Sequence, residues 1–218
     1  MKIVIINGSP RERGLTSEIL HIIENRLINK GAEVAFYNLG ELNIKQCSGC
    51  CSCYTTGKCI FNDDAENLSL EIADADGIVI GSPTYASNIS GLLKKFVDRG
   101  HFVIEQLLFN KYAVSVTTGE NYGSKDANKI LNKLLSYSGA KISRKLVLNA
   151  PFNSTFCDEK RASDIADKLY KDIIINNAYL FQKIKHRIIF SMGIKPFVQK
   201  KGKKYQGVTN RWKKTGII

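Results

Sequence analysis

Cysteines are the residues of this chain whose type and spacing most directly suggest chemistry. Five of the six lie within "CSGCCSCYTTGKC", which runs from Cys47 to Cys59. If Cys51 is set aside, the spacing is Cys47-x2-Cys50-x2-Cys53-x5-Cys59. Four thiolates this close together can surround an iron–sulfur cube, and a C-x2-C-x2-C run is a recognised ligand pattern. Zinc, a catalytic disulfide and a loop without metal are the other interpretations.

The rest of the sequence predicts a cytoplasmic location for these thiols. The apolar run "IVII" near the N-terminus has only four residues, far fewer than the core of a signal peptide. No stretch of the sequence approaches the roughly 18 apolar residues of a membrane-spanning helix. In a reducing compartment, dense cysteines are more often metal ligands or reactive thiols than disulfides. We therefore expect no disulfide framework.

Charge divides the chain into two parts. The formal net charge is +12, yet from Lys183 to the C-terminus there are eleven Lys and Arg residues and no Asp or Glu. Removing these eleven from the total of 32 leaves 21 basic residues against 20 acidic ones. We therefore predict a nearly neutral domain over residues 1–182, with a cysteine-rich insertion at residues 45–64, and a basic amphipathic tail over residues 183–218. The tail has no nucleic-acid-binding motif, so we expect no nucleic-acid partner.

Apolar runs and helical periods alternate along the predicted domain. The apolar runs predict five buried strands, "KIVIING", "EVAFYNL", "GIVIGSP", "KYAVSVTTG" and "KISRKLVLNA". Helical periods predict helices over residues 15–31, 65–76, 90–108 and 124–139, and a last long helix from about Asp158 past Tyr179. Parallel neighbours need crossover helices, so the pattern predicts one doubly wound α/β sheet. Ligands of such sheets bind outside the carboxyl ends of the strands.

The loop after the first strand, "NGSPRERGLTSE", has the chemistry of a phosphate cradle. It joins a strand to a helix N-terminus, where unpaired N–H groups and the helix dipole favour an anion. Ser9, Thr16 and Ser17 add hydroxyl groups, and Arg11 adds a positive charge. The loop matches neither GxGxxG nor GxxxxGK[ST], which argues against a dinucleotide site and a nucleotide P-loop. The alternative is a helix capped by Ser or Thr behind a glycine turn.

Two further strand-end loops supply groups that suit a flat ring. In "GSPTYASNISGLLKKFVDR", Pro83 stiffens the strand exit, while Tyr85 and Asn88 offer an aromatic face and an amide. A tyrosine at such a place can equally be part of the packing. The loop "TTGENYGS", residues 117–124, is small and polar with two glycines. Three such loops at one sheet edge predict a single site with a phosphate end and a ring end.

The order of these motifs resembles a known family. "GSPRERGLTS" followed by "GSPTYASNISGLLKKFVDR" is similar to the flavodoxin-fold NAD(P)H-dependent FMN reductases, and "CSGCCSC…C" between them resembles the iron–sulfur flavoproteins of that group. The resemblance covers about residues 1 to 150. It implies a flavodoxin-like five-stranded parallel sheet of order 2-1-3-4-5 that binds FMN. The residues that it implies for the ribityl phosphate are Ser9, Arg11, Thr16 and Ser17, and those for the isoalloxazine ring are Pro83, Thr84, Tyr85, Asn88, Thr117, Thr118 and Gly119.

The same resemblance maps the ligands of a [4Fe-4S] cluster onto four cysteines, Cys47, Cys50, Cys53 and Cys59. The short, even spacing of the first three also suits a cube better than the paired knuckles of a zinc site. Similar cysteine-rich loops followed by acidic residues, as in "GKCIFNDD", occur in flavodoxin-fold reductases for which no iron need be assumed. A cysteine-rich loop without a cluster therefore remains an alternative.

Other reactive residues receive no catalytic role. Asp98 and Arg99 match the family's motif, and we assign them a structural role in their helix. Cys157, far from the other cysteines, is expected to be a packed thiol. No catalytic histidine is expected, because none lies in the three loops: His21 and His101 fall on predicted helices and His186 falls in the tail. The chemistry is then that of FMN, which accepts hydride and passes on electrons singly or in pairs.

The predicted function is an FMN-dependent oxidoreductase. It would take electrons from NAD(P)H or a reduced carrier and pass them to a quinone, flavin or protein acceptor, with a [4Fe-4S] cluster as a candidate intermediate. NAD(P)H rests on the resemblance alone, because no local motif marks its site. The alternatives are a non-enzymatic electron-transfer protein and a cysteine-based redox-sensing module.

Assembly and the tail are the last expectations. The resemblance implies a homodimer or a larger homo-oligomer. For the tail, the simplest interpretation is a solvated arm packed by its aromatic residues. A segment lying on a membrane surface, a patch for an acidic partner and an arm over a neighbouring subunit are the alternatives.

Overall fold

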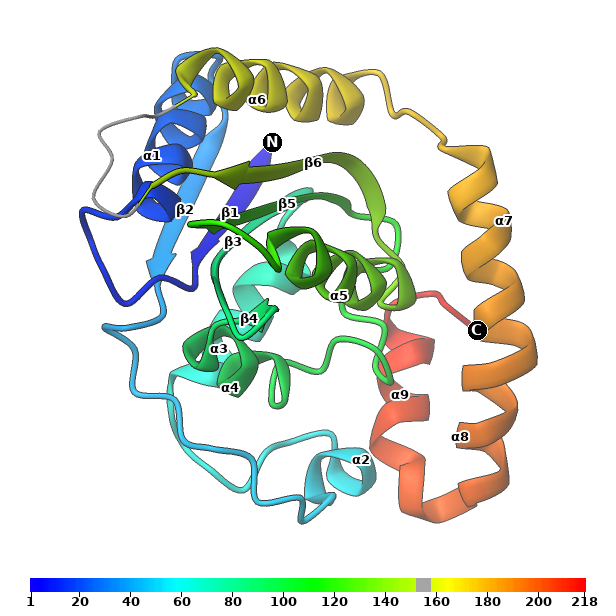
Figure 1. The fold of residues 1–218 in the computed structure, drawn as a ribbon. Helices are drawn as coiled ribbons and strands as arrows, with labels where there is room; N and C mark the ends of the chain where they lie inside the picture. The colour runs from blue at the N-terminus through cyan, green and yellow to red at the C-terminus, as the bar shows by residue number, and fades with distance from the viewer. Residues whose placement is uncertain (152–157) are drawn as a thin grey trace.

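A computed structural model describes residues 1–151 and 158–218, so the expectation that Cys157 is a packed thiol lies outside the described residues. Within these ranges, a parallel sheet has the order β2-β1-β3-β5-β6 (Figure 1). Its strands are β1 (Lys2–Asn7), β2 (Glu33–Asn38), β3 (Gly77–Tyr85), β5 (Tyr112–Gly119) and β6 (Lys141–Asn149). Counted over the parallel strands, this is the predicted 2-1-3-4-5 order. A short strand that was not predicted, β4 (Asn88–Ile89), pairs antiparallel with the end of β3.

Alternate side chains of the strands enter two separate cores. Val4 and Ile6 of β1 pack with three helices on one face, whereas Ile3 and Ile5 pack with two helices on the other. A strand covered on both faces must be apolar at nearly every position, which explains the continuous apolar runs in the sequence. The first face holds α3 (Asp64–Asp74), α4 (Gly91–Val97) and α5 (Ser124–Tyr137), and the second holds α1 (Leu15–Ile28) and α6 (Glu159–Ile174).

Hydrogen bonds between strand-end loops fix the edge of the sheet. Ser90 caps α4, since its Oγ accepts the N–H of Leu93 at 3.1 Å, and the same hydroxyl donates to the Gly8 carbonyl at 2.6 Å. The Ser90 N–H in turn donates to Ser82 Oγ at 2.9 Å. The loop after β1 and the turn after β3 are therefore held together before any ligand is considered.

The predicted helix over residues 90–108 ends early. Only Gly91–Val97 is helical, and the following turns contain left-handed residues at His101, Gln106 and Asn110, with φ of 58°, 59° and 64°. The prediction that His101 lies on a helix is therefore wrong. The Gln106 amide donates to the Val103 carbonyl and, at 2.9 Å, to the Tyr137 carbonyl. These side-chain hydrogen bonds supply partners for backbone carbonyl groups at the turn. The apolar residues of this stretch reach the core without a helical period.

The last long helix also ends earlier than predicted. α6 ends at Ile174, and Tyr179 has a left-handed φ of 43°. The buried carboxylate of Asp172 explains the break, because it accepts the Tyr179 hydroxyl at 2.6 Å and the Asn177 amide at 2.9 Å. These bonds fold the chain back on the end of α6. A second helix then starts at Leu180.

The basic C-terminal residues form a helical hairpin beside the sheet (Figure 1). The hairpin consists of α7 (Leu180–Ile189), the π-helical η1 (Phe190–Ile194), α8 (Lys195–Lys201), the 3-10 turn η2 (Gly202–Tyr205) and α9 (Gln206–Lys214). Phe190 and Trp212 pack with Val198 in a small core, whereas Phe181 and Phe197 are exposed. None of the described helices is long and apolar enough to cross a membrane.

Candidate functional site

The three predicted strand-end loops meet at one cavity of about 310 Å³. Its lining includes eight of the eleven residues predicted to bind FMN, namely Ser9, Arg11, Thr16, Pro83, Thr84, Tyr85, Thr118 and Gly119. They meet because β1, β3 and β5 are parallel and end at the same edge of the sheet. Thr16 Oγ1 and Thr118 Oγ1 are hydrogen-bonded at 2.7 Å, which joins the first loop to the third.

The first loop presents a helix N-terminus to this cavity. α1 begins after Gly14, and no side chain of the described residues caps it, so the first-turn N–H groups are available to an anion. The alternative prediction, a helix capped by a Ser or Thr side chain, is therefore wrong for α1. Ser9 instead folds the loop on itself, since its Oγ accepts the Arg11 N–H at 3.1 Å and donates to the Arg11 carbonyl at 3.0 Å. Arg13 adds a second guanidinium to the lining.

Ser17, Asn88 and Thr117, the other three predicted residues, do not line the cavity. Ser17 is fully buried, and its hydroxyl donates to the Arg11 carbonyl at 2.6 Å. The Thr117 hydroxyl donates to the Ser124 carbonyl at 3.0 Å. These hydrogen bonds hold the loops in shape, and direct contacts of the three residues with FMN remain predictions.

Sequence reasoning missed part of the lining. Ala150 and Pro151, directly after β6, also line the cavity, together with the first loop's Gly14 and Leu15. The signal was present, because the strand-end rule applies to the fifth parallel strand as it does to the first, third and fourth.

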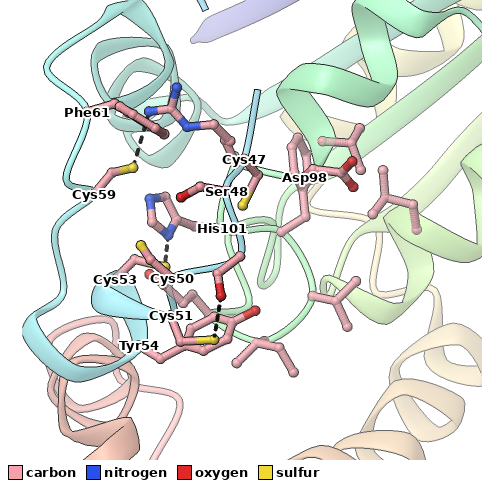
Figure 2. A pocket seen from close by; sticks show the side chains of 18 residues that line it. Cys47, Ser48, Cys50, Cys51, Cys53, Tyr54, Cys59, Phe61, Asp98 and His101 are labelled. Atoms are coloured by element: carbon pink, nitrogen blue, oxygen red, sulfur yellow. Dashed lines mark hydrogen bonds and ion pairs between the residues drawn. The ribbon is translucent and has the colours of Figure 1, made fainter. Parts of the chain in front are cut away.

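The predicted cluster ligands line a second cavity, of about 320 Å³. Cys51 lies in its wall with the four predicted ligands, and Figure 2 shows the sulfur atoms of all five around His101. Cys53 and Cys59 are partly buried, whereas the other three are exposed: Cys47, Cys50 and Cys51. All five thiols of the loop thus line one cavity, and among the described cysteines only Cys53 belongs to a group of three metal-ligating side chains whose atoms lie within 4.8 Å of one another.

Left-handed residues give the cysteine loop its shape. Gly49 and Gly57 have φ of 71° and 80°, and Cys51, with φ of 59°, starts the short helix α2 (Ser52–Thr56). Glycine adopts this conformation without steric cost, while a cysteine there is uncommon. Cys51 therefore has a backbone role in turning the chain between Cys50 and Cys53.

Arg99 holds one end of the cysteine loop. Its buried guanidinium donates to Asp63 Oδ1 at 2.9 Å, to the Lys45 carbonyl at 2.9 Å and to Cys59 Sγ at 3.2 Å. Burial by itself would raise the pKa of Asp63, but hydrogen bonds, first that of Arg99, hold the pKa of this carboxyl below its ordinary value. The structural role expected for Arg99 thus includes a direct contact with a predicted ligand.

A second set of charged side chains lies beside Cys53. The ligating atoms of Cys53, His101 and Glu105 all lie within 4.8 Å of one another. Glu105 is fully buried, and its Oε1 is 2.5 Å from His101 Nδ1. Its Oε2 is 2.5 Å from Nε of Arg211, which comes from α9 at the far end of the chain. Sequence reasoning did not find this group, because no motif connects residues so far apart.

α9 forms part of the support behind the cysteines (Figure 1). Gly207 lies so close to the end of α2 that a Cβ there would be 2.2 Å from the Gly57 nitrogen and 2.9 Å from the Cys53 carbonyl oxygen. Arg211 Nη2 donates to the Gly57 carbonyl at 3.2 Å. Trp212 is fully buried and donates to the Ile104 carbonyl at 3.0 Å. The basic tail is thus packed against the back of the cysteine loop.

The thiols have different electrostatic environments. Burial, followed by the charges of Glu105 and Cys59, raises the pKa of Cys53 to about 11. The pKa of Cys50 is lowered, first by the backbone N–H of Ser52 and then by the Ser48 side chain. A bound metal ion would favour the thiolate at each cysteine, because a coordinating thiol is deprotonated.

The two cavities are separate within one chain. No described residue lines both of them. The first lies at the ends of β1, β3 and β5, whereas the second lies beyond the end of α4, next to α2.

Comparisons with known proteins agree with this arrangement. Residues 1–154 match the family described as NADPH-dependent FMN reductase. An iron–sulfur flavoprotein of Clostridioides difficile (strain 630) is 36% identical over 227 residues, covering 100% of both chains. An iron–sulfur flavoprotein of Methanocaldococcus jannaschii is 35% identical over 120 residues, which are 55% of this chain and 62% of that relative.

Solved structures show the same fold at low sequence identity. The apo form of an NADH:FMN oxidoreductase (EmoB) has a TM-score of 0.60 and 19% identity, covering 80% of this chain and 89% of that one. A flavone reductase has a TM-score of 0.66 and 20% identity, covering 82% and 65%. At these identities the likeness shows the fold alone.

Proposed function

The chain belongs to the NADPH-dependent FMN reductase family and is an FMN flavoprotein oxidoreductase, and from this premise we propose that it passes electrons through a [4Fe-4S] cluster held by its own cysteines. The donor that we propose is NAD(P)H or a reduced carrier, and the acceptor is a quinone, a flavin or a protein. The observation that carries the proposal is the presence of two lined cavities, one at the strand ends and one among the cysteines.

The strand-end cavity fits a flavin phosphate and ring. Thr84 Oγ1 is buried without a hydrogen-bond partner among the described residues, and Thr84 lines the cavity. A Cβ on Gly119 would lie 2.2 Å from Ser124 Oγ and 3.4 Å from Thr84 Cβ, so a side chain there would require Ser124 to move. The uncapped N-terminus of α1 and the guanidinium of Arg13 suit the phosphate. Tyr85, which is 46% exposed, offers its ring to the flat isoalloxazine.

The cysteine cavity fits a cluster by the chemistry of its donors. Four thiols in the predicted spacing line it, and the wall also has apolar side chains, Phe61, Val97, Phe102 and Ile104 among them. Arg99 points an N–H donor at Cys59 Sγ, and hydrogen bonds to ligating sulfurs are a means of tuning a cluster's potential. We assign the ligands to Cys47, Cys50, Cys53 and Cys59.

In the proposed reaction the protein binds and orients FMN and the cluster, and it keeps them in separate cavities. FMN, when bound, supplies hydride acceptance and one- or two-electron release, and a cluster supplies single-electron transfer. Thr16 and the first turn of α1 position the phosphate end, Pro83 and Tyr85 shape the ring end, and the hydrogen bond between Thr16 and Thr118 joins the two ends. No described histidine lines the strand-end cavity, and we assign no catalytic histidine to the flavin chemistry.

The test is an anaerobic purification followed by assays of iron, acid-labile sulfide and flavin. We expect FMN together with about four irons and four sulfides per chain, as for a [4Fe-4S] centre. Cys53→Ala should remove the cluster absorbance and leave FMN bound. Cys51→Ala is the matched control, because it changes a neighbouring thiol outside the ligand spacing, and it should keep most of the iron.

Three outcomes would contradict the proposal in different ways. Flavin without iron and sulfide in the anaerobic wild type would remove the cluster. If neither NADH nor NADPH supports turnover with a quinone or a flavin as the acceptor, the result would favour a non-enzymatic electron carrier. A monomer in analytical ultracentrifugation would remove the homo-oligomer that we propose with this function.

A further inference from the structure

Two buried ion pairs present opposite charges to the cysteines. The pair of Arg99 and Asp63, with side chains 1% and 0% exposed, turns its guanidinium toward Cys59. The pair of Arg211 and Glu105 turns its carboxylate toward Cys53, since the ligating atoms of Glu105 and Cys53 lie within 4.8 Å of each other. One end of the cavity therefore has a cation near its sulfur and the other end has an anion.

The carboxylate near Cys53 is held away from solvent. The Glu105 side chain is 0% exposed and contacts His101 and Arg211 through its two oxygens. Arg211, at 20% exposure, is held by its second bond to the Gly57 carbonyl. Charges in such a place interact strongly, because the surrounding protein screens them far less than water does. The electrostatic potential that Glu105 produces at Cys53 is therefore partly offset by the positive charge of Arg211, to an extent that depends on the distance of Arg211.

We propose that Glu105 and Arg211 act as a pair of positioning residues that set the reduction potential of the cluster in opposite directions. The inference rests on the proposed cluster and adds to it a role for the C-terminal helix α9. Neither residue lines the strand-end cavity or is among the residues that we predict to bind FMN.

The direction of each effect follows from Coulomb's law. Reduction adds one electron to the cluster, so a nearby anion opposes it and a nearby cation favours it. Glu105→Gln removes the anion and should raise the reduction potential. Arg211→Gln removes the compensating cation and should lower it. The double variant removes both charges and should have a potential near that of the wild type.

A role limited to packing predicts a different pattern. Loss of either partner would then loosen the same contact between α2 and α9, so both single variants would change the cluster in the same direction. If the potential depended only on the net charge of the protein, removal of any negative charge would raise it. Asp126→Asn is the control for this possibility. Asp126 is exposed, pairs with Lys129 and does not line the cysteine cavity, so this variant removes one solvent-screened negative charge and should not shift the potential.

The experiment is a redox titration of the purified holoprotein, followed by electron paramagnetic resonance, for the wild type and these four variants. Iron, sulfide and flavin are measured first. Opposite shifts in the two single variants, with the double variant between them, support the proposal. Equal-sign shifts or no shift in proteins with full cluster content would overturn it. A wild type with flavin and no iron would refute the proposed cluster itself, which is a distinct result.

If Arg211→Gln loses the cluster, its reduction potential cannot be measured, and Arg211→Lys then provides the test. Lysine retains the positive charge but not the guanidinium geometry. We expect Arg211→Lys to retain the cluster at nearly the wild-type potential. If Arg211→Lys loses the cluster as Arg211→Gln does, the contact is structural and the electrostatic proposal is wrong.

Discussion

The strand-end cavity and the cysteine cavity are about equal in size, yet they are built by different means. The first is lined by loops that leave one edge of a sheet, and hydrogen bonds such as that of Thr16 with Thr118 join those loops. The second is lined by a loop with little regular structure, and residues from distant parts of the chain support it. A cavity of the first kind is a property of sheet topology, whereas one of the second kind depends on side-chain packing.

This difference has a physical consequence for stability. The strand ends are anchored by the main sheet, whose strands β1, β3 and β5 are almost entirely buried. The cysteine loop is anchored by two ion pairs and by α9. We therefore expect changes in the tail and in the ion pairs to affect iron content while they leave flavin content unchanged.

The largest effect is expected for Trp212→Ala. Trp212 is fully buried and packs edge-on against Phe190 at 5.0 Å between ring centroids, so the change should cost about 3–5 kcal/mol of unfolding free energy. Detachment of α9 should remove most of the iron and leave FMN bound. Urea unfolding and cofactor assays measure both, with Trp212→Phe as the milder control. Equal loss of both cofactors would show that the two regions are not independent.

Arg99→Met should have the next largest effect. It leaves the buried carboxylate of Asp63 without its charged partner, with only the N–H groups of Lys45 and Ala65 as donors among the described residues, and breaking such a pair costs about 3 kcal/mol. The loss of the N–H donor to Cys59 should also lower the cluster's reduction potential. The measurements are thermal unfolding and redox titration. Arg99→Lys keeps the positive charge beside Asp63 and should lose less stability than Arg99→Met, and an equal loss in the two variants would contradict the ion-pair explanation.

Thr118→Val should have a smaller effect, and on the other cavity. It removes the hydrogen bond to Thr16, which is worth about 1 kcal/mol. The dissociation constant of FMN should rise roughly fivefold, as that free energy implies. Fluorescence titration of the apoprotein with FMN measures it, and iron content should not change. A loss of iron with unchanged FMN affinity would contradict the expectation that this residue acts on the strand-end cavity and not on the cysteine cavity.

The smallest effect is expected from the pH dependence of the tail. Burial lowers the pKa of His186, whose Nε2 donates a hydrogen bond to Gln106 Oε1 at 2.6 Å. The unfolded chain then takes up a proton below about pH 6.5 while the folded chain does not. This part of the stability is present above about pH 6.5 and is lost as the pH falls through the lowered pKa of the folded state.

Urea unfolding at pH 7.5 and at lower pH measures that loss. His186→Gln should reduce the dependence, because glutamine does not titrate in this range. His21→Gln is the matched control, since the His21 side chain is 49% exposed, and it should leave the dependence as in the wild type. The same pH dependence in all three proteins would assign it to other groups.

Much of the strand-end cavity could be predicted from the sequence, and the reason is local. Continuous apolar runs mark strands that are covered on both faces, and the loops after them must then share one edge. Ser9, Thr16 and Tyr85 could be placed at that edge without knowledge of packing. Ser17 and Thr117 were placed there as well, but side-chain direction turned them to other partners, and direction is not encoded by position in a loop.

The helices after the sheet core were less predictable. The apolar period after Val97 indicated a helix, yet turns satisfied by Gln106 took its place. Asp172 ended α6 through contacts with residues beyond the helix. In both cases a single buried polar side chain outweighed the helical pattern, because an unpaired polar group in the core is costly.

The sequence by itself determined the α/β sheet, the strand-end site and the gathering of thiols in one short segment. These features depend on periodicity and on close spacing along the chain. Only the tertiary structure decided that Arg99 faces Cys59, that Glu105 lies beside Cys53, and that Arg211 of the basic tail compensates its charge. The physical reason is that buried charges are selected by their partners in space, and those partners are separated by up to 106 residues of sequence.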